Sequence, residues 1–256
     1  MTEREQGEEG MAKEKKGGWG ETIRTIAYAL LIAVGVRTFA YEPFTIPSGS
    51  VLPTLLVGDY LFVSKFSYGF SRYSLPFSLP LISGRLLASE PERGDVAVFK
   101  LPKDNKTDYI KRLVGLPGDR IQVREGRLYI NDKIVERELV GEVELTERGG
   151  FTRRVKEYLE TLPNGAQHRI WERSDSQYLD NTQVYVVPEG HYFAMGDNRD
   201  SSQDSRVLNA VGYVPFENLV GRADVLFFSK EEGSSILAFW EWPTSIRWER
   251  IFDGVN

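Results

Sequence analysis

The strongest hydrophobic feature of the chain is an uninterrupted apolar stretch near the N-terminus, over residues 26–36. Arg24 and Arg37 flank it, and we expect one helix over residues 23–40. Such a helix is about 27 Å long, which is enough to cross the hydrocarbon core if both arginine side chains reach the interfaces. The pattern therefore predicts a single transmembrane anchor behind a polar tail, residues 1–22.

The distribution of basic residues predicts the orientation of this anchor. Those that precede or open the helix are Arg4, Lys13, Lys15, Lys16 and Arg24. On the far side, Arg37 is the only basic residue before Glu42. The positive-inside rule then places the N-terminus in the cytoplasm and everything after Tyr41 outside. A cleaved signal peptide is the alternative, because residues 38–40 loosely resemble a small-residue cleavage site.

Beyond the anchor, the pattern changes to short runs of β-branched and aromatic residues that end at polar or turn residues. These runs cover residues 60–63, 96–99, 184–187 and 225–228, and each is typical of a β-strand. Alternating apolar positions with turn residues at 125–126 and 131–132 predict a hairpin over residues 121–135. Residues 136–176 are charged and have few strong apolar runs, which indicates an interruption without specifying its fold.

Two further apolar segments are candidates for contact with a membrane surface. Residues 75–82 are too short and too broken by proline to cross a bilayer. Near the C-terminus, aromatic residues gather at Phe239, Trp240, Trp242, Trp248 and Phe252. Tryptophan favours the headgroup region, so interfacial contact is one interpretation. The other is ordinary core packing, or a loop folded over the sheet.

Composition narrows the chemistry that the chain can perform. With 256 residues, it is long enough for one large domain or two modest ones. It has no cysteine, which excludes disulfides, thiolate metal sites and a cysteine nucleophile. A net charge of −5 argues against a nucleic-acid partner. We expect no cofactor and no metal, because Asp197, Asp200 and Asp204 lack the spacing of a calcium loop and no phosphate-binding loop is present.

A serine-rich segment shortly after the anchor, residues 47–54 (PSGSVLPT), is the strongest candidate for catalysis. If Ser50 is a nucleophile, both histidines of the chain, His168 and His191, lie far from it in the sequence. The best candidate for a base is Lys111, within an apolar run. Lowering a lysine pKa from ~10.4 to near 8 corresponds to ~3 kcal/mol, which burial can supply. A lysine on a solvated strand face is the alternative.

Three more segments follow the serine segment in a fixed order: residues 93–100 (RGDVAVFK), 109–119 (YIKRLVGLPGD) and 196–206 (GDNRDSSQDSR). Together the four segments resemble the conserved boxes of bacterial type I signal peptidases. The family usually carries methionine where this chain has Val51. The match runs across most of the chain.

The resemblance implies a mostly β protein: an N-terminal transmembrane helix, then an antiparallel β catalytic domain (residues 41–124 and 187–256) with a smaller inserted β domain (125–186). It also implies a serine endopeptidase that removes signal peptides from exported preproteins by cutting after a small residue. The expected location is the bacterial inner (plasma) membrane. There, the single-pass chain would present its catalytic domain on the periplasmic or extracytoplasmic side, in contact with the lipid bilayer.

The resemblance further assigns roles to individual residues. Ser50 is the expected nucleophile and Lys111 the expected base, while the Ser50 backbone N–H and the Ser48 hydroxyl would stabilise the oxyanion. Ser202 would hydrogen-bond the lysine amine. The expected ion pairs are Asp204 with Arg206 and Asp197 with Arg112. The expected substrate pockets are lined by Phe44, Ile46, Pro47, Val51, Leu55, Tyr109 and Ile110.

Two rival interpretations remain. One is another type of Ser/Lys peptidase, such as a self-cleaving repressor, which would carry a DNA-binding helical domain and no anchor. The other is a membrane-tethered β scaffold that binds exported proteins without cutting them. A scaffold has no need of both Ser50 and Lys111, and it would show no turnover.

Overall fold

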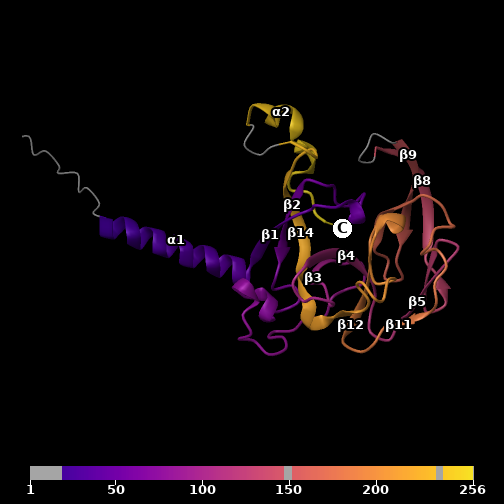
Figure 1. The fold of residues 1–256 in the computed structure, drawn as a ribbon, viewed down its shortest axis with the longest axis horizontal. Helices are drawn as coiled ribbons and strands as arrows, with labels where there is room; N and C mark the ends of the chain where they lie inside the picture. Colours follow the sequence, from indigo (N-terminus) through magenta and orange to yellow (C-terminus); the bar gives the residue numbers. More distant parts are fainter. Residues whose placement is uncertain (1–18, 147–151, 235–238, 256) are drawn as a thin grey trace, which may run out of the picture.

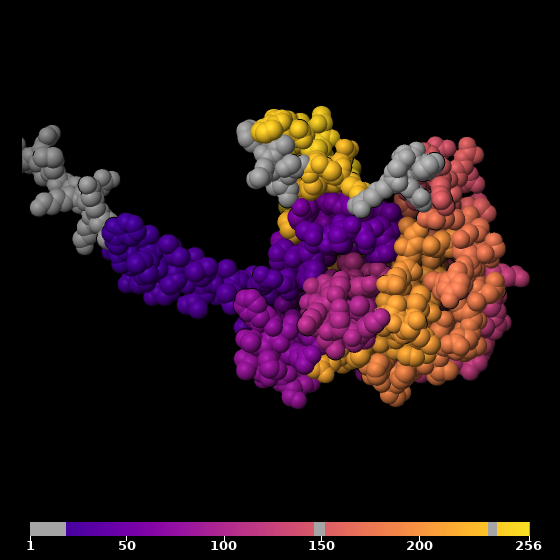
Figure 2. All heavy atoms as spheres, in the orientation of Figure 1, coloured from indigo at the N-terminus to yellow at the C-terminus, as the bar shows by residue number. Residues whose placement is uncertain are grey.

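The structure is a computed structural model, and it describes residues 19–146, 152–234 and 239–255. Its first element is helix α1 (Trp19–Phe39), whose large apolar side chains are mostly exposed. Figures 1 and 2 show this helix projecting from the folded body as a rod. With a mean hydropathy of 1.4, it is long and apolar enough to cross a membrane. It begins four residues before the expected start at 23, because the polar Gly20–Thr22 stretch continues the helix. The basic tail residues Arg4, Lys13, Lys15 and Lys16 lie outside the described residues.

The largest sheet is antiparallel and has seven strands in the order β1-β2-β14-β3-β4-β12-β13. Its strands are β1 (Tyr41–Thr45), β2 (Asp59–Ser64), β3 (Val96–Lys100), β4 (Asp108–Gly115), β12 (His191–Met195), β13 (Val214–Pro215) and β14 (Leu219–Ser229). Strands β3 and β4 lie near the centre, so side chains on both of their faces are buried. The mostly β class expected from the sequence is confirmed.

Two smaller antiparallel sheets lie between β4 and β12 in the chain. One has the order β11-β5-β6-β7, formed by β5 (Arg120–Arg124), β6 (Arg127–Ile130), β7 (Lys133–Ile134) and β11 (Tyr185–Val186). The other has the order β10-β9-β8, formed by β8 (Glu136–Thr146), β9 (Thr152–Thr161) and β10 (Gln167–Glu172). The charged segment 136–176 is therefore largely strand. Figure 1 shows these strands on the side of the body away from α1.

The predicted hairpin is present, and both of its turns are two residues long. Arg124 pairs with Arg127, and Ile130 with Lys133. The four turn residues at 125–126 and 131–132 all have positive φ, as tight hairpin turns require. The domain boundary expected between residues 124 and 125 lies at the turn that joins the paired strands β5 and β6.

The remaining described elements are short. They are α2 (Trp242–Ser245) and the 3₁₀ turns η1 (Gly49–Val51), η2 (Arg72–Ser74), η3 (Pro76–Ser78), η4 (Arg199–Ser201), η5 (Phe216–Asn218), η6 (Phe239–Glu241) and η7 (Trp248–Arg250). The apolar segments at 75–82 and near the C-terminus lie in this group. Phe77 is 98% exposed, Trp240 68% and Trp248 57%, so these side chains are not core residues. The side chain of Phe239 lies outside the described part.

Ion pairs connect the end of α1 to the sheet. Glu42 in β1 accepts hydrogen bonds from Arg37 near the end of α1, at 2.6 and 3.0 Å. Its other oxygen is 2.7 Å from the ammonium of Lys65, whose side chain is 3% exposed. Lys65 also donates to the Ser74 carbonyl at 2.9 Å. The last turn of the helix is therefore linked to the folded body and not simply joined to it by the chain.

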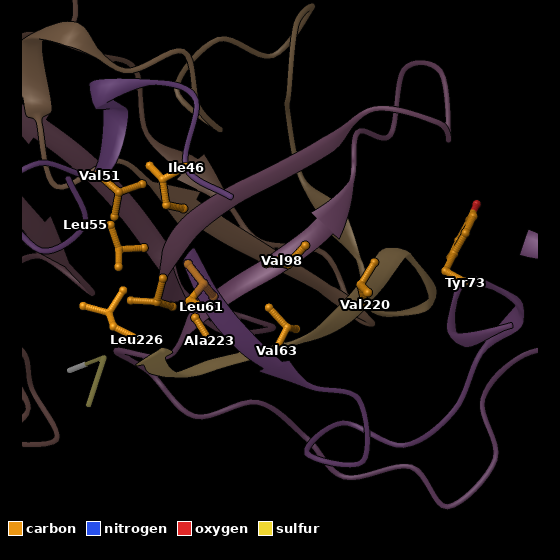
Figure 3. Close-up of a cluster of buried hydrophobic side chains, with 11 residues drawn as sticks. Ile46, Val51, Leu55, Leu61, Val63, Tyr73, Val98, Val220, Ala223 and Leu226 are labelled. Atoms are coloured by element: carbon orange, nitrogen blue, oxygen red, sulfur yellow. The ribbon is translucent and has the colours of Figure 1, made fainter. Parts of the chain in front are cut away.

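A hydrophobic cluster fills the space beneath the serine segment. It combines Val51 and Leu55 with Leu61 of β2 and Leu226 of β14, all of them essentially inaccessible to solvent. Figure 3 shows these side chains gathered together with Ile46. Burying a large aliphatic side chain stabilises the fold by ~1.5–3 kcal/mol. The cluster therefore fixes the short turn η1, which carries Ser50.

Candidate active site

The fold brings the predicted nucleophile and base together. Ser50 lies in η1 and Lys111 in β4, 61 residues apart in the chain, and Lys111 Nζ is 2.6 Å from Ser50 Oγ. A second hydrogen bond from Nζ to the Ile110 carbonyl, 2.9 Å, fixes the direction of the amine. This distance suits direct proton transfer between the hydroxyl and the amine.

The environment of Lys111 favours the neutral amine. Its side chain lies within the sheet interior, and the residue is 3% exposed. Burial lowers the pKa of Lys111 to about 8, although the nearby carboxylates of Asp204 and Asp197 oppose the shift. The amine lies over the ring of Tyr109, 5.3 Å from its centroid, a contact that favours the charged form and so opposes the effect of burial as well. The solvated-face alternative is therefore wrong for this lysine.

The loop over residues 196–206 packs directly against the nucleophile turn. The backbone N–H of Asn198 donates to the Ser50 carbonyl at 3.2 Å. The Asn198 side chain donates to the Gly49 carbonyl at 2.9 Å. At Gly196 there is no room for a Cβ atom, which would overlap both the Ser50 carbonyl oxygen and Ser202 Oγ. The loop thus holds the Ser50 backbone by close packing as well as by hydrogen bonds.

Both expected ion pairs are present, and both are buried. Arg112 donates two hydrogen bonds, of 2.9 and 2.8 Å, to the Asp197 carboxylate. Arg206 likewise donates two hydrogen bonds, both of 2.9 Å, to the Asp204 carboxylate. Burial alone would raise the pKa of each carboxyl group, but the guanidinium partner outweighs burial and holds the pKa below its usual value. Breaking such a pair from one side typically costs ~3–5 kcal/mol, because the other charge is left buried and alone.

The expected hydrogen bond from Ser202 to the lysine amine is absent from this structure. The Ser202 hydroxyl is buried and makes no hydrogen bond of regular geometry. It lies against Gly196, while the hydrogen bonds of the amine go to Ser50 and Ile110. The hydroxyl is instead close enough to the Asp204 carboxylate to help hold the pKa of that group below its usual value.

An open cleft of about 390 Å³ lies in front of the dyad. It is lined by Pro47, Ser48, Gly49, Ser50, Asp108, Tyr109, Ile110, Lys111, Ser201 and Gln203. The predicted pocket residues Pro47, Tyr109 and Ile110 and the predicted oxyanion donor Ser48 are therefore at the cleft. The Ser48 side chain is exposed at its rim.

The other residues predicted for the substrate pocket do not line this cleft. Val51 and Leu55 are fully buried, and Ile46 is 3% exposed, because all three pack into the cluster under η1. They form the floor that supports the nucleophile turn and do not line the cleft in this structure. Phe44 is half-buried against the same cluster and faces a separate, smaller depression near the end of α1.

Several residues at the site were not singled out from the sequence. Thr54 donates to Asp197 at 2.6 Å, and the Gln203 side chain accepts from the Tyr109 hydroxyl at 3.0 Å. Thr54, Gln203 and Asn198 all lie inside the four segments that resemble the family. Their position in these segments could therefore have identified them from the sequence. His168 lies outside these segments and had no such signal, although the fold places it 4.0 Å from Asp197.

Neither histidine is positioned as the base. His168 is buried, and its Nε2 atom is 3.3 Å from a carboxylate oxygen of Glu160, on the side of Asp197 away from the dyad. His191 lies at the start of β12, where its ring contacts the Glu189 carbonyl. Among the described residues, no group of three or more histidine, aspartate or glutamate side chains is arranged to hold a metal ion.

Comparison with known proteins gives consistent matches. Residues 19–228 match the family described as signal peptidase, peptidase S26. Over 247 residues the chain is 44% identical to signal peptidase I of Rickettsia canadensis (strain McKiel), covering 90% of this chain and 91% of the relative. Signal peptidase I of Rickettsia typhi (strain ATCC VR-144 / Wilmington) is 44% identical over 250 residues, with coverages of 91% and 92%. A solved signal peptidase I from Enterococcus faecalis V583 covers 52% of this chain and 97% of its own, with 26% identity and a TM-score of 0.30.

Proposed function

The chain belongs to the signal peptidase family, peptidase S26, and from this premise we propose that it cuts with Ser50 as nucleophile and Lys111 as general base. As a member of this family, the protein is a serine peptidase that removes signal peptides from preproteins. The observation that carries the residue assignment is the 2.6 Å contact between Lys111 Nζ and Ser50 Oγ.

The proposed reaction starts when the neutral amine of Lys111 takes the proton of the Ser50 hydroxyl. Ser50 Oγ then bonds to the scissile carbonyl carbon, and the developing oxyanion accepts hydrogen bonds from the Ser50 backbone N–H and the Ser48 hydroxyl. The protonated lysine passes its proton to the leaving amine, and the peptide C–N bond breaks. Water, deprotonated by Lys111, then hydrolyses the ester and releases Ser50.

The cleft supports a substrate with a small residue before the cut. Ser50 is itself part of the cleft lining, together with the apolar side chains of Pro47, Tyr109 and Ile110. The core residues beneath η1 leave no deep pocket there, because Val51 and Leu55 are already packed. An exported preprotein cut after a small side chain therefore fits this cleft.

We place the protein in the bacterial inner (plasma) membrane with a single span, α1. The N-terminus is in the cytoplasm and the sheets are on the periplasmic or extracytoplasmic side, as the charge distribution favours. Exposed Phe77, Trp240 and Trp248 supply apolar surface for lipid contact. Enzyme and membrane-inserted signal peptide then share one surface, which raises their effective concentration.

Cleavage of a preprotein in detergent by the purified protein tests the assignment. We expect Ser50→Ala and Lys111→Met each to abolish cleavage while the fold is retained, since the nucleophile or the base is lost. Thermal unfolding gives the control for the fold, and mass spectrometry identifies the product. Substantial turnover by either variant would contradict the Ser/Lys assignment, and binding without turnover by the unaltered protein would favour the scaffold.

A further inference from the structure

Behind the loop 196–206 lies a buried group of charged side chains that reaches into the sheet β10-β9-β8. Glu160 of β9 receives two hydrogen bonds from the guanidinium of Arg199 in η4, one of them 2.9 Å. His168 of β10 lies between carboxylates, 3.3 Å from Glu160 and 4.0 Å from Asp197. Arg112, the ion-pair partner of Asp197, completes the group. All five side chains are almost completely buried: Arg112, Glu160, His168, Asp197 and Arg199.

The charges in this group balance when the imidazole is neutral. Two guanidinium groups, Arg112 and Arg199, face the carboxylates of Asp197 and Glu160. Burial lowers the pKa of His168, and the charge of Arg112 lowers it further, so the neutral ring is favoured. Burial alone would raise the pKa of Glu160, but Arg199 and His168 together outweigh burial and hold that pKa well below its usual value. Removing the Glu160 charge would therefore leave Arg199 buried without its counter-charge.

Residues 197 and 198 also contact the two segments that carry Ser50 and Lys111. Asp197 holds Arg112, the next residue after Lys111 in β4. Asn198 holds the backbone of Gly49 and Ser50 through its side chain and its N–H. Three consecutive residues, 197–199, thus connect Glu160 to the strand of the base and to the turn of the nucleophile.

A backbone contact strengthens this connection. The N–H of Trp171 in β10 donates to the Asp197 carbonyl at 2.9 Å. The N–H of Arg173, just after β10, donates to the Asp200 carboxylate at 2.6 Å. The sheet β10-β9-β8 therefore holds both ends of the 197–200 segment.

We propose that Glu160, supported by His168, is a positioning residue for the Ser50–Lys111 dyad, acting through Arg199 and the 197–199 stretch. The inference rests on the proposed function, because it concerns the alignment of that dyad. Alignment matters because a displacement of about 1 Å at reacting groups can lower a rate ~100-fold. In this arrangement the sheet β10-β9-β8 contributes to turnover although none of its residues lines the cleft.

The chain offers a matched control on the same strand. Glu157 of β9 is also a buried carboxylate; it pairs with Arg169 and accepts from Trp171 Nε1 at 2.9 Å. These side-chain partners are in β10, and Glu157 does not reach the 196–206 loop. Glu157→Gln and Glu160→Gln are therefore the same chemical change in one strand. Glu160 is hydrogen-bonded directly to Arg199 of the 197–199 stretch, whereas Glu157 is linked to that stretch only through Trp171, whose contact with Asp197 is made by its backbone and not by its side chain.

The test measures kcat and KM separately with the full-length protein in detergent, well below each variant's unfolding temperature. We expect Glu160→Gln to lower kcat by about ten- to a hundredfold while KM stays close to the unaltered value. Glu160→Asp, which keeps the charge, should recover part of the loss. Glu157→Gln should retain the unaltered kcat even if it is less stable.

Equal kcat values for folded Glu160→Gln and Glu157→Gln would overturn the inference. If Glu160→Gln does not fold, Glu160→Asp and His168→Gln replace it, and an unaltered kcat in both overturns the inference. Failure of the proposed function is a separate result, because Ser50→Ala or Lys111→Met would then retain cleavage in the same assay.

Discussion

The burial of Lys111 sets the pH range in which the dyad can work. Its pKa is lowered to about 8, so below that pH most of the amine is protonated and cannot accept the Ser50 proton. We therefore expect kcat/KM to rise with pH up to about 8 and then to level off. A pH profile measured with a peptide substrate checks this. A profile that falls with rising pH between 6 and 8 would contradict a lysine base.

Ser202 gives a second prediction, because its buried hydroxyl lies near the Asp204 carboxylate without making a hydrogen bond of regular geometry. Ser202→Ala removes this weak contact together with a poorly satisfied buried polar group, so the unfolding temperature should change little. We expect kcat nevertheless to fall about tenfold, because the hydroxyl is then missing when the protonated amine of Lys111 turns away from Ser50. Thermal unfolding and steady-state kinetics measure the two effects. Lower stability with unchanged kcat would mean that the hydroxyl only supports the fold.

Among the elements, the contact between the 196–206 loop and η1 is the most sensitive to added volume. A methyl group at Gly196 would overlap the Ser50 carbonyl and must displace the nucleophile turn. We expect Gly196→Ala to lower kcat at least ~100-fold. Gly141→Ala in β8 is the control, because a Cβ there meets no atom within 4 Å. Equal activity of the two variants would show that the turn tolerates the shift.

The elements also show which parts of the fold the sequence could predict. The runs at 60–63 and 96–99 became β2 and β3, because their apolar side chains are buried, at alternating positions in the run of β2 and at consecutive positions in β3. Strands β9 and β10 were not predicted, because some of their buried positions hold charged residues such as Glu160 and His168. A carboxylate that is buried because an arginine from elsewhere neutralises it looks like a surface residue in the sequence.

The site residues that could be predicted are those with a signal in the local sequence. Ser50 and Lys111 lie in segments whose resemblance to a known family marks them. The pocket residues Val51 and Leu55 were assigned by position in the segment alone, and only the fold shows that they point into the core. His168 had no local signal, because its neighbour Asp197 lies 29 positions further along the chain and is brought close by the backbone contact between Trp171 and the 196–206 loop.

At the level of the whole molecule, exposed aromatic side chains lead to a prediction about lipid binding. Trp240, Trp248 and Phe77 are 68%, 57% and 98% exposed. We expect a protein that starts at Ala40, without the anchor, to bind lipid vesicles. Replacing Trp240, Trp242 and Trp248 with serine should weaken that binding.

Vesicle flotation measures this binding, and Tyr178→Ser supplies the control. Tyr178 is 91% exposed and lies in the segment between β10 and β11, so its loss should leave binding unchanged. If the anchor-free protein stays off the vesicles and is monomeric without detergent, the helix alone attaches the enzyme to the membrane.

The tie between α1 and the sheet has a geometric consequence. Arg37 and Lys65 both hold Glu42, so the end of the helix and the first strand move as one piece. Ser50 follows that strand directly and rests on the core below it. If α1 crosses the bilayer as proposed, this link would keep Ser50 at one height above the membrane surface. The position of the cut in a membrane-spanning signal peptide would then depend on which peptide bond lies at that height.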